Sequence, residues 1–131
     1  MTQESVDFVL ASYEWGNRER AFARDWWHPD GEYVNTREDP DHATHRGIEA
    51  IEKLFASWLE AYPDVRVHPV EARGNGNRVF VWVRFSGHGA ESGIPLEMEL
   101  AHVITLEGGR VRRLEEYFDR AEALQAAGLS E

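Results

Sequence analysis

Two polar residues interrupt otherwise apolar strand faces near the end of the chain, and both have side chains that can move protons. Residues 96–106 alternate with a period of two, so their apolar side chains and His102 share one face. In residues 111–119 the same alternation places Glu116 among apolar side chains. Burying a carboxylate is costly unless it is paired or used, so the pattern predicts a polar site in apolar surroundings.

The turn between these two strands decides whether His102 and Glu116 meet. A two-residue Gly-Gly turn would pair Leu106 with Val111, and His102 would not face Glu116. A three-residue loop that includes the next arginine would pair Glu107 with Val111 and set His102 opposite Glu116. The second register matches apolar with apolar residues, which normally decides register, so we predict a cross-strand His–Glu pair.

Composition limits the functions that this chain is expected to have. At 131 residues it is expected to form a single domain, 1–131, large enough to bury a core. The net charge of −10 argues against nucleic acid and anionic membranes as partners. The chain has no cysteine, and its first residues show neither a signal peptide nor a membrane span. We therefore expect a cytoplasmic location.

The hydrophobic periodicity changes from helical to alternating along the chain, which is typical of an α+β fold with helices on one face of a curved antiparallel sheet. The His-Pro-Asp-Gly sequence at 28–31 is expected to be a turn. Helices are predicted over 4–16, 17–27, 48–62 and 121–127. Strands are predicted over 32–35, 65–72, 78–87, 96–106 and 111–119, with a polar loop over 36–46.

Several local motifs together resemble one superfamily across nearly the whole chain. They are Asp30–Asn35, Gly47–Ile51, Glu107–Val111, Leu114–Asp119 and the helix-to-glycine sequence 123–129. Their order resembles the nuclear transport factor 2-like superfamily, and within it the SnoaL-like polyketide cyclases and limonene epoxide hydrolases. The resemblance implies a cone-shaped, cystatin-like curved antiparallel sheet wrapped around N-terminal helices, with an internal apolar pocket.

The resemblance assigns roles to individual residues. Family cyclases carry an acid/base carboxylate on the last strand and a histidine on the preceding one, and Glu116 and His102 resemble that pair. Tyr33 and Asn35 match the water-holding residues of the epoxide hydrolases on the first strand.

The residues of the middle strand argue against one member of this group. Epoxide hydrolases also require an arginine and an aspartate two residues apart, and here those positions are Val83 and Phe85. The resemblance therefore implies a cyclase or isomerase rather than an epoxide hydrolase.

A buried carboxylate beside a histidine suits proton transfer at a carbon next to a carbonyl. We predict Glu116 as the acid/base and His102 as its partner, with no cofactor and no metal. The substrate is expected to be a small hydrophobic molecule. The residues predicted to bind it are Tyr33, Asn35, Tyr13, Trp58, Val83, Phe85, Met98, Leu100 and Phe118.

Two alternatives of other classes stay open at this point. The first is a non-catalytic protein of the same fold that binds small molecules. The second is a structural dimer module, because Phe80 and Trp82 lie on the sheet face away from the pocket and suggest a homodimer interface. His42 and His45 have the spacing of metal ligands. Their acidic loop is nevertheless expected to be exposed to solvent or to form a lid over the pocket.

Overall fold

The structure is a computed structural model that describes residues 2–130. Three helices, one short 3₁₀ turn and six strands follow one another within those residues. They are α1 (Thr2–Glu19), η1 (Arg24–Trp26), β1 (Trp27–Val34), β2 (Thr44–Arg46), α2 (Ile48–Ala61), β3 (Arg66–Asn75), β4 (Arg78–His88), β5 (Pro95–Glu107), β6 (Arg110–Tyr117) and α3 (Arg120–Ala126).

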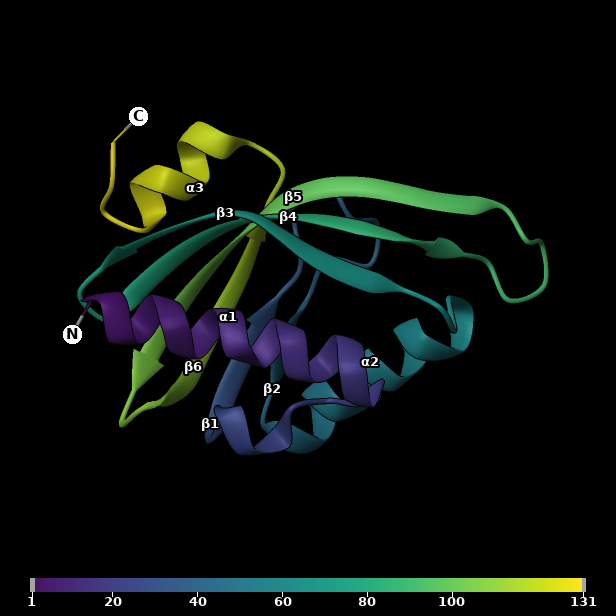
Figure 1. The fold of residues 1–131 in the computed structure, drawn as a ribbon, viewed down its shortest axis with the longest axis horizontal. Helices are drawn as coiled ribbons and strands as arrows, with labels where there is room; N and C mark the ends of the chain where they lie inside the picture. Colours follow the sequence, from purple (N-terminus) through teal and green to yellow (C-terminus); the bar gives the residue numbers. More distant parts are fainter. Residues whose placement is uncertain (1, 131) are drawn as a thin grey trace.

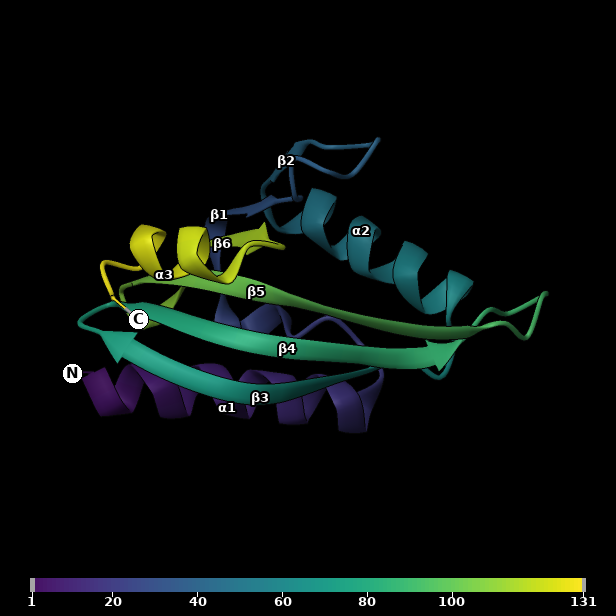
Figure 2. The same cartoon turned by 90° about the horizontal axis from the view of Figure 1, so that it is seen from above.

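The six strands form one curved sheet in the order β2-β1-β6-β5-β4-β3 (Figures 1 and 2). The predicted α+β class is confirmed, with one correction to the strand directions. β1 and β6 pair in parallel, whereas every other neighbouring pair is antiparallel. No hairpin joins β1 to β6, because most of the chain lies between them, so nothing in their connection requires opposite directions.

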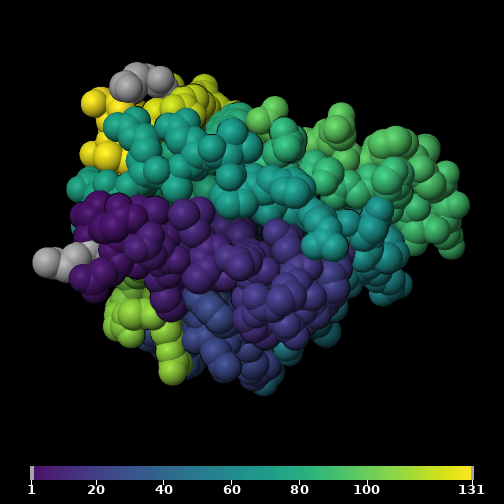
Figure 3. Space-filling model, in the orientation of Figure 1, coloured from purple at the N-terminus to yellow at the C-terminus, as the bar shows by residue number. Residues whose placement is uncertain are grey.

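The concave face of the sheet holds the larger core. Its strands contribute Val79, Val81, Val83, Leu100, Ile104, Leu106, Val111 and Leu114, and α1 and α2 contribute Val6, Val9 and Ile51. The helix α1 runs along β3 and covers this face, as the view from above shows (Figure 2). In the space-filling view α1 lies on the front surface, and the turn after β4 projects from one end (Figure 3).

The convex face is covered in part by the short helix α3. Phe80 is fully buried there, against Ala123, Leu124 and Ala127 of the helix region. The neighbouring Trp82 is only partly buried, and its indole N–H donates to Glu99 at 2.9 Å. Phe80 is therefore buried by α3 of the same chain and cannot belong to the predicted homodimer surface. Of the two residues predicted for that surface, Trp82 alone is partly exposed.

The N-terminal region differs from the prediction. The expected break at Gly16-Asn17 does not occur, and α1 continues to Glu19, after which Arg20 adopts a left-handed conformation with φ of 58°. The predicted helix over 17–27 was wrong, because residues 17–19 end α1 and only the short η1 follows before β1 begins at Trp27. The side chain of Asn17 instead exchanges two hydrogen bonds, at 2.8 and 3.0 Å, with the backbone of Val67 and fastens α1 to β3.

The region after α1 also contains more strand than predicted. The 28–31 segment lies inside β1, where the pairing with β6 shifts register, and is not an isolated turn. The end of the predicted polar loop forms β2, which pairs with β1. Both differences arise because pairing with distant strands supplies hydrogen bonds that local sequence does not reveal.

The β5–β6 hairpin has the predicted register at the site, but its turn differs from the predicted three-residue loop. His102 lies opposite Glu116, which confirms the cross-strand placement. The turn is nevertheless a two-residue turn, because Leu106 pairs with Val111. A β-bulge then follows, since Arg112 is an extra residue before Thr105 pairs with the next residue along β6. The bulge shifts the register by one residue and restores apolar matching.

Candidate active site

A cavity of about 520 Å³ lies between the concave face of the sheet and the helices α1 and α2. Its wall is mostly aromatic and aliphatic, and α2 contributes Phe55 and Trp58. Polar side chains gather where β5, β6 and the end of β1 meet, the part of the wall that holds His102 and Glu116. An apolar cavity with a few convergent polar groups is the usual form of a small-molecule site.

Most of the predicted site residues line this cavity. They are Tyr13, Tyr33, Asn35, Trp58, Phe85, Met98, Leu100, His102, Glu116 and Phe118. Val83 does not, because it is fully buried in the core of the sheet, between its ladder partners Pro69 and Leu100. Phe118 is 40% exposed, which places it at the rim of the cavity and not in its depth.

Glu116 is a partly buried carboxylate with defined hydrogen-bond partners. The hydroxyl of Tyr33 donates to its Oε2 at 2.5 Å, and the backbone N–H of Thr36 donates to its Oε1 at 3.3 Å. Burial raises the pKa of Glu116, while the hydrogen bonds from Tyr33 and Thr36 act in the opposite direction. The negative charge of Asp39 adds to the rise in pKa.

His102 is 4% exposed, and its main partner comes from α1. Its Nδ1 lies 2.7 Å from the hydroxyl oxygen of Tyr13, and the two rings stack with centroids 5.8 Å apart. Burial lowers the pKa of His102 to about 3, so its imidazole is neutral near neutral pH. Burial likewise raises the pKa of Tyr13, which keeps its phenol protonated.

The two residues predicted to form a pair therefore have separate tyrosine partners. Glu116 is bonded to Tyr33 and His102 to Tyr13, although the two share one rung of the β5–β6 ladder. The rings of Tyr33 and His102 are in edge-to-face contact at 6.3 Å, which joins the two hydrogen-bonded units. The sequence predicted Tyr13 and Tyr33 only as binding residues, because the position of α1 relative to β5 was not predictable from local pattern.

The buried neutral histidine leads to a prediction about acid stability. Between pH 6.5 and 4.5 the unfolded chain protonates its histidine and folded His102 does not, so the free energy of unfolding falls as pH falls. The slope approaches about 1.4 kcal/mol per pH unit below the pKa of the unfolded histidine, and the loss over this window is roughly 2 kcal/mol.

The raised pKa of Glu116 acts with the opposite sign above its ordinary value, because the folded state then binds the extra proton. The free energy of unfolding is therefore measured in a Glu116→Gln background, by urea unfolding at pH 6.5 and at pH 4.5. Adding His102→Gln should remove most of the pH dependence in this window. An unchanged slope in the double variant would contradict the assignment.

The loop after β1 contributes wall residues that the sequence did not single out. Glu38, Asp39 and Pro40 line the cavity beside Glu116. Two histidines hold the start of this loop: His45 donates to the Asn35 side chain at 2.8 Å, and His42 donates to the backbone carbonyls of Asn35 and Thr36 at 2.9 Å. Within residues 2–130 no three potential ligand side chains converge in a metal-binding group.

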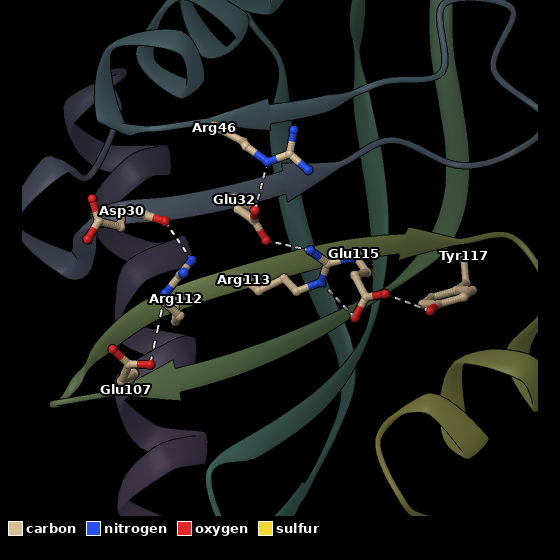
Figure 4. A network of polar contacts seen from close by, with 8 residues as sticks. All are labelled: Asp30, Glu32, Arg46, Glu107, Arg112, Arg113, Glu115 and Tyr117. Carbon is tan, nitrogen blue, oxygen red and sulfur yellow. Dashed lines mark hydrogen bonds and ion pairs between the residues drawn. The ribbon is translucent and has the colours of Figure 1, made fainter.

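The opposite face of β6 carries a charged network (Figure 4). Arg113 is ion-paired to Glu32 at 2.5 Å and to Glu115 at 3.6 Å, and the Tyr117 hydroxyl donates to Glu115 at 2.9 Å. Burial raises the pKa of Tyr117 to about 12, and the hydrogen bond to Glu115 adds to the rise. Consecutive glutamates of β6 thus have different surroundings: Glu115 belongs to this network and Glu116 lines the cavity.

Comparison with known proteins identifies the family. The SnoaL-like domain family matches residues 9–114, and the chain therefore belongs to the SnoaL-like domain family. The phenazine biosynthesis protein PhzA1 of Pseudomonas aeruginosa is 31% identical over 101 residues, which is 72% of this chain and 62% of that protein. The chain thus spans about three-fifths of the length of this relative.

Solved structures share the fold over almost the whole chain. A protein classed as a SnoaL-like polyketide cyclase from Jannaschia sp. CCS1 has a TM-score of 0.74 at 20% identity, with 99% of this chain and 95% of that chain covered. TerC, co-crystallised with polyporic acid, has a TM-score of 0.72 at 25% identity, with 94% and 96% covered. The predicted superfamily is confirmed. No helix within residues 2–130 is long and apolar enough to span a bilayer.

Proposed function

We propose that this protein catalyses a cofactor-free proton transfer at a carbon next to a carbonyl, of the cyclase or isomerase type, on a small hydrophobic molecule. Glu116 takes the proton from that carbon and returns it during the reaction. His102 faces the oxygen on which negative charge develops. The observation that carries the proposal is a carboxylate with a raised pKa in the wall of an apolar cavity.

The environment of Glu116 suits acid/base work. A carboxylic acid exchanges protons with carbon acids best when its pKa approaches the working pH, and burial moves the pKa of Glu116 in that direction. The hydrogen bond from Tyr33 orients the carboxyl group. The same hydrogen bond acts against the rise in the pKa of Glu116.

The neutral state of His102 also supports this assignment. A protonated imidazole beside Glu116 would lower the pKa of the carboxyl and weaken it as a base. Because burial keeps His102 neutral, it is available as a hydrogen-bonding group without that effect. A hydrogen-bond donor aimed at the developing oxyanion contributes by electrostatic stabilisation in such a dry site.

The test uses a ketone whose α-protons exchange with solvent. The protein is incubated with 2-tetralone in D₂O, and loss of the α-proton signal is followed by NMR. The wild-type protein should accelerate exchange above the rate with the same concentration of Glu116→Gln. Equal rates for the two proteins would refute the proposal.

Tyr33 gives a prediction about the carboxyl itself. Replacing Tyr33 by phenylalanine removes the strongest hydrogen bond to the carboxylate form of Glu116, so the pKa of Glu116 should rise further. Carbon-13 NMR titration of the glutamate side chains measures this directly, with the Glu116→Gln spectrum assigning the signal. A fall in the pKa of Glu116 would show that Tyr33 does not favour the ionised form.

A second function is favoured by one observation. Both carboxyl oxygens of Glu116 already accept hydrogen bonds, as expected for a carboxylate that only supports a ligand-binding wall. In that case the protein binds a small hydrophobic molecule without changing it. Ligand affinity that is the same in wild type and Glu116→Gln, without α-proton exchange in either, would support this alternative.

A further inference from the structure

His102 leaves one buried polar atom unexplained. Its Nε2 is the buried side-chain nitrogen or oxygen that has no hydrogen-bond partner within residues 2–130. Native proteins rarely bury such an atom, and an exception calls for an explanation. The side chain lines the cavity, so a molecule in the cavity is the natural candidate for the missing partner.

Counting protons decides which nitrogen of His102 carries its hydrogen. If Nδ1–H donated to the hydroxyl of Tyr13, both the phenol proton and the Nε2 lone pair would lack a partner. If the phenol donates to Nδ1, only the Nε2–H lacks one. The second arrangement leaves fewer buried groups unsatisfied, and it also joins the more acidic donor to the more basic acceptor.

The groups around the ring are aromatic or already hydrogen-bonded to other residues. Besides Tyr13 on α1, His102 contacts the rings of Tyr33 on β1 and Phe85 on β4 edge-to-face, at 6.3 and 5.9 Å. Glu116 on β6 lies opposite and is bonded to Tyr33 and Thr36. Both members of the His102–Tyr13 pair are neutral, because burial lowers the pKa of the imidazole and raises that of the phenol.

We infer that Tyr13 is a positioning residue that fixes the Nε2–H tautomer of His102, so that the cavity offers a neutral donor to the oxygen of an uncharged carbonyl ligand. The choice of a carbonyl as the ligand group rests on the proposed function, whereas the tautomer does not. A ligand that brings an acceptor satisfies Nε2–H, and an apolar ligand of the same shape leaves it unsatisfied.

The tautomer is measured without any substrate. Histidine labelled with ¹⁵N gives long-range proton–nitrogen correlations that distinguish protonated from unprotonated ring nitrogens, and the His102→Gln spectrum assigns the signals. Wild type should show protonated Nε2 and unprotonated Nδ1. Tyr13→Phe should increase the Nδ1–H form, whereas Tyr62→Phe, which removes another hydroxyl of the cavity wall, should not.

The ligand preference is measured with two molecules of nearly the same shape. Acetophenone carries a carbonyl oxygen where α-methylstyrene carries a methylene group. NMR titration of wild type should give acetophenone an advantage in Kd of about three- to tenfold, the effect of one hydrogen bond between neutral groups. Tyr13→Phe should lose this advantage and Tyr62→Phe should keep it.

Three results would overturn the inference. They are an Nδ1–H tautomer in wild type, unchanged His102 signals in Tyr13→Phe, and equal Kd values for the two ligands in wild type. The wild-type spectrum decides the tautomer even if Tyr13→Phe does not fold. Failure of α-proton exchange would refute the proposed function alone, because neither measurement here depends on turnover.

Discussion

Replacing Glu116 by glutamine is expected to lower the rate of α-proton exchange in 2-tetralone by about 10²- to 10⁴-fold, the usual contribution of a placed acid/base group. Glutamine has nearly the same shape and can still accept a hydrogen bond from Tyr33, so the fold and the cavity should persist. Only the ability to take up the proton is lost. The measurement is the initial exchange rate by proton NMR at a saturating protein concentration.

The neighbouring residue provides a matched control. Glu115→Gln removes a carboxylate of the same strand that lies in the Arg113 network (Figure 4), and exchange should stay close to the wild-type rate. A loss in Glu115→Gln as large as that in Glu116→Gln would indicate a general effect of charge or stability, and it would remove the evidence for acid/base catalysis.

Replacing Phe80 by alanine is expected to lower the free energy of unfolding by about 3–5 kcal/mol, because a fully buried aromatic side chain leaves a cavity between β4 and α3. The guanidinium of Arg120 also lies 5.2 Å from the centre of this ring and would lose that contact. Urea unfolding followed by circular dichroism measures the change.

The same substitution at an exposed phenylalanine provides the control. Phe118 is 40% exposed, so Phe118→Ala should cost much less stability than Phe80→Ala. This comparison also bears on assembly. If Phe80→Ala dissociated a dimer and left the stability of the protomer unchanged, Phe80 would be an interface residue and the packing described here would be incorrect.

The sequence predicted the central feature of the site because apolar matching is a strong constraint on strand register. His102 and Glu116 were placed opposite each other because the alternative register would have set Arg113 against Ile104. The bulge at Arg112 was not predicted, although its signal is present. Val111 and Leu114 both face inward, and their odd spacing is incompatible with an uninterrupted strand.

Contacts between distant elements could not be read from the sequence. The bond from Tyr13 to His102 depends on how α1 lies across the sheet, which no local pattern specifies. The error over 17–27 has a related origin: a helical spacing of aromatic residues there reflects packing against Phe55 and Trp27 around Phe22, without a helix. Tertiary packing overrode local periodicity in the 17–27 segment.

The bulge at Arg112 gives one backbone position control over which glutamate enters the cavity. If every residue were kept but paired without a bulge, Thr105 would pair with Arg112, and Glu115 would lie opposite His102 in place of Glu116. Deleting Arg112 itself would remove the bulge and still leave Glu116 opposite His102, whereas deleting a paired residue between Arg112 and Glu116 would exchange the inner and outer faces of the strand beyond it. In a relative whose hairpin differs in length, the face on which each β6 residue lies depends on whether a bulge is present. An alignment of the proposed acid/base residue must therefore take the bulge into account.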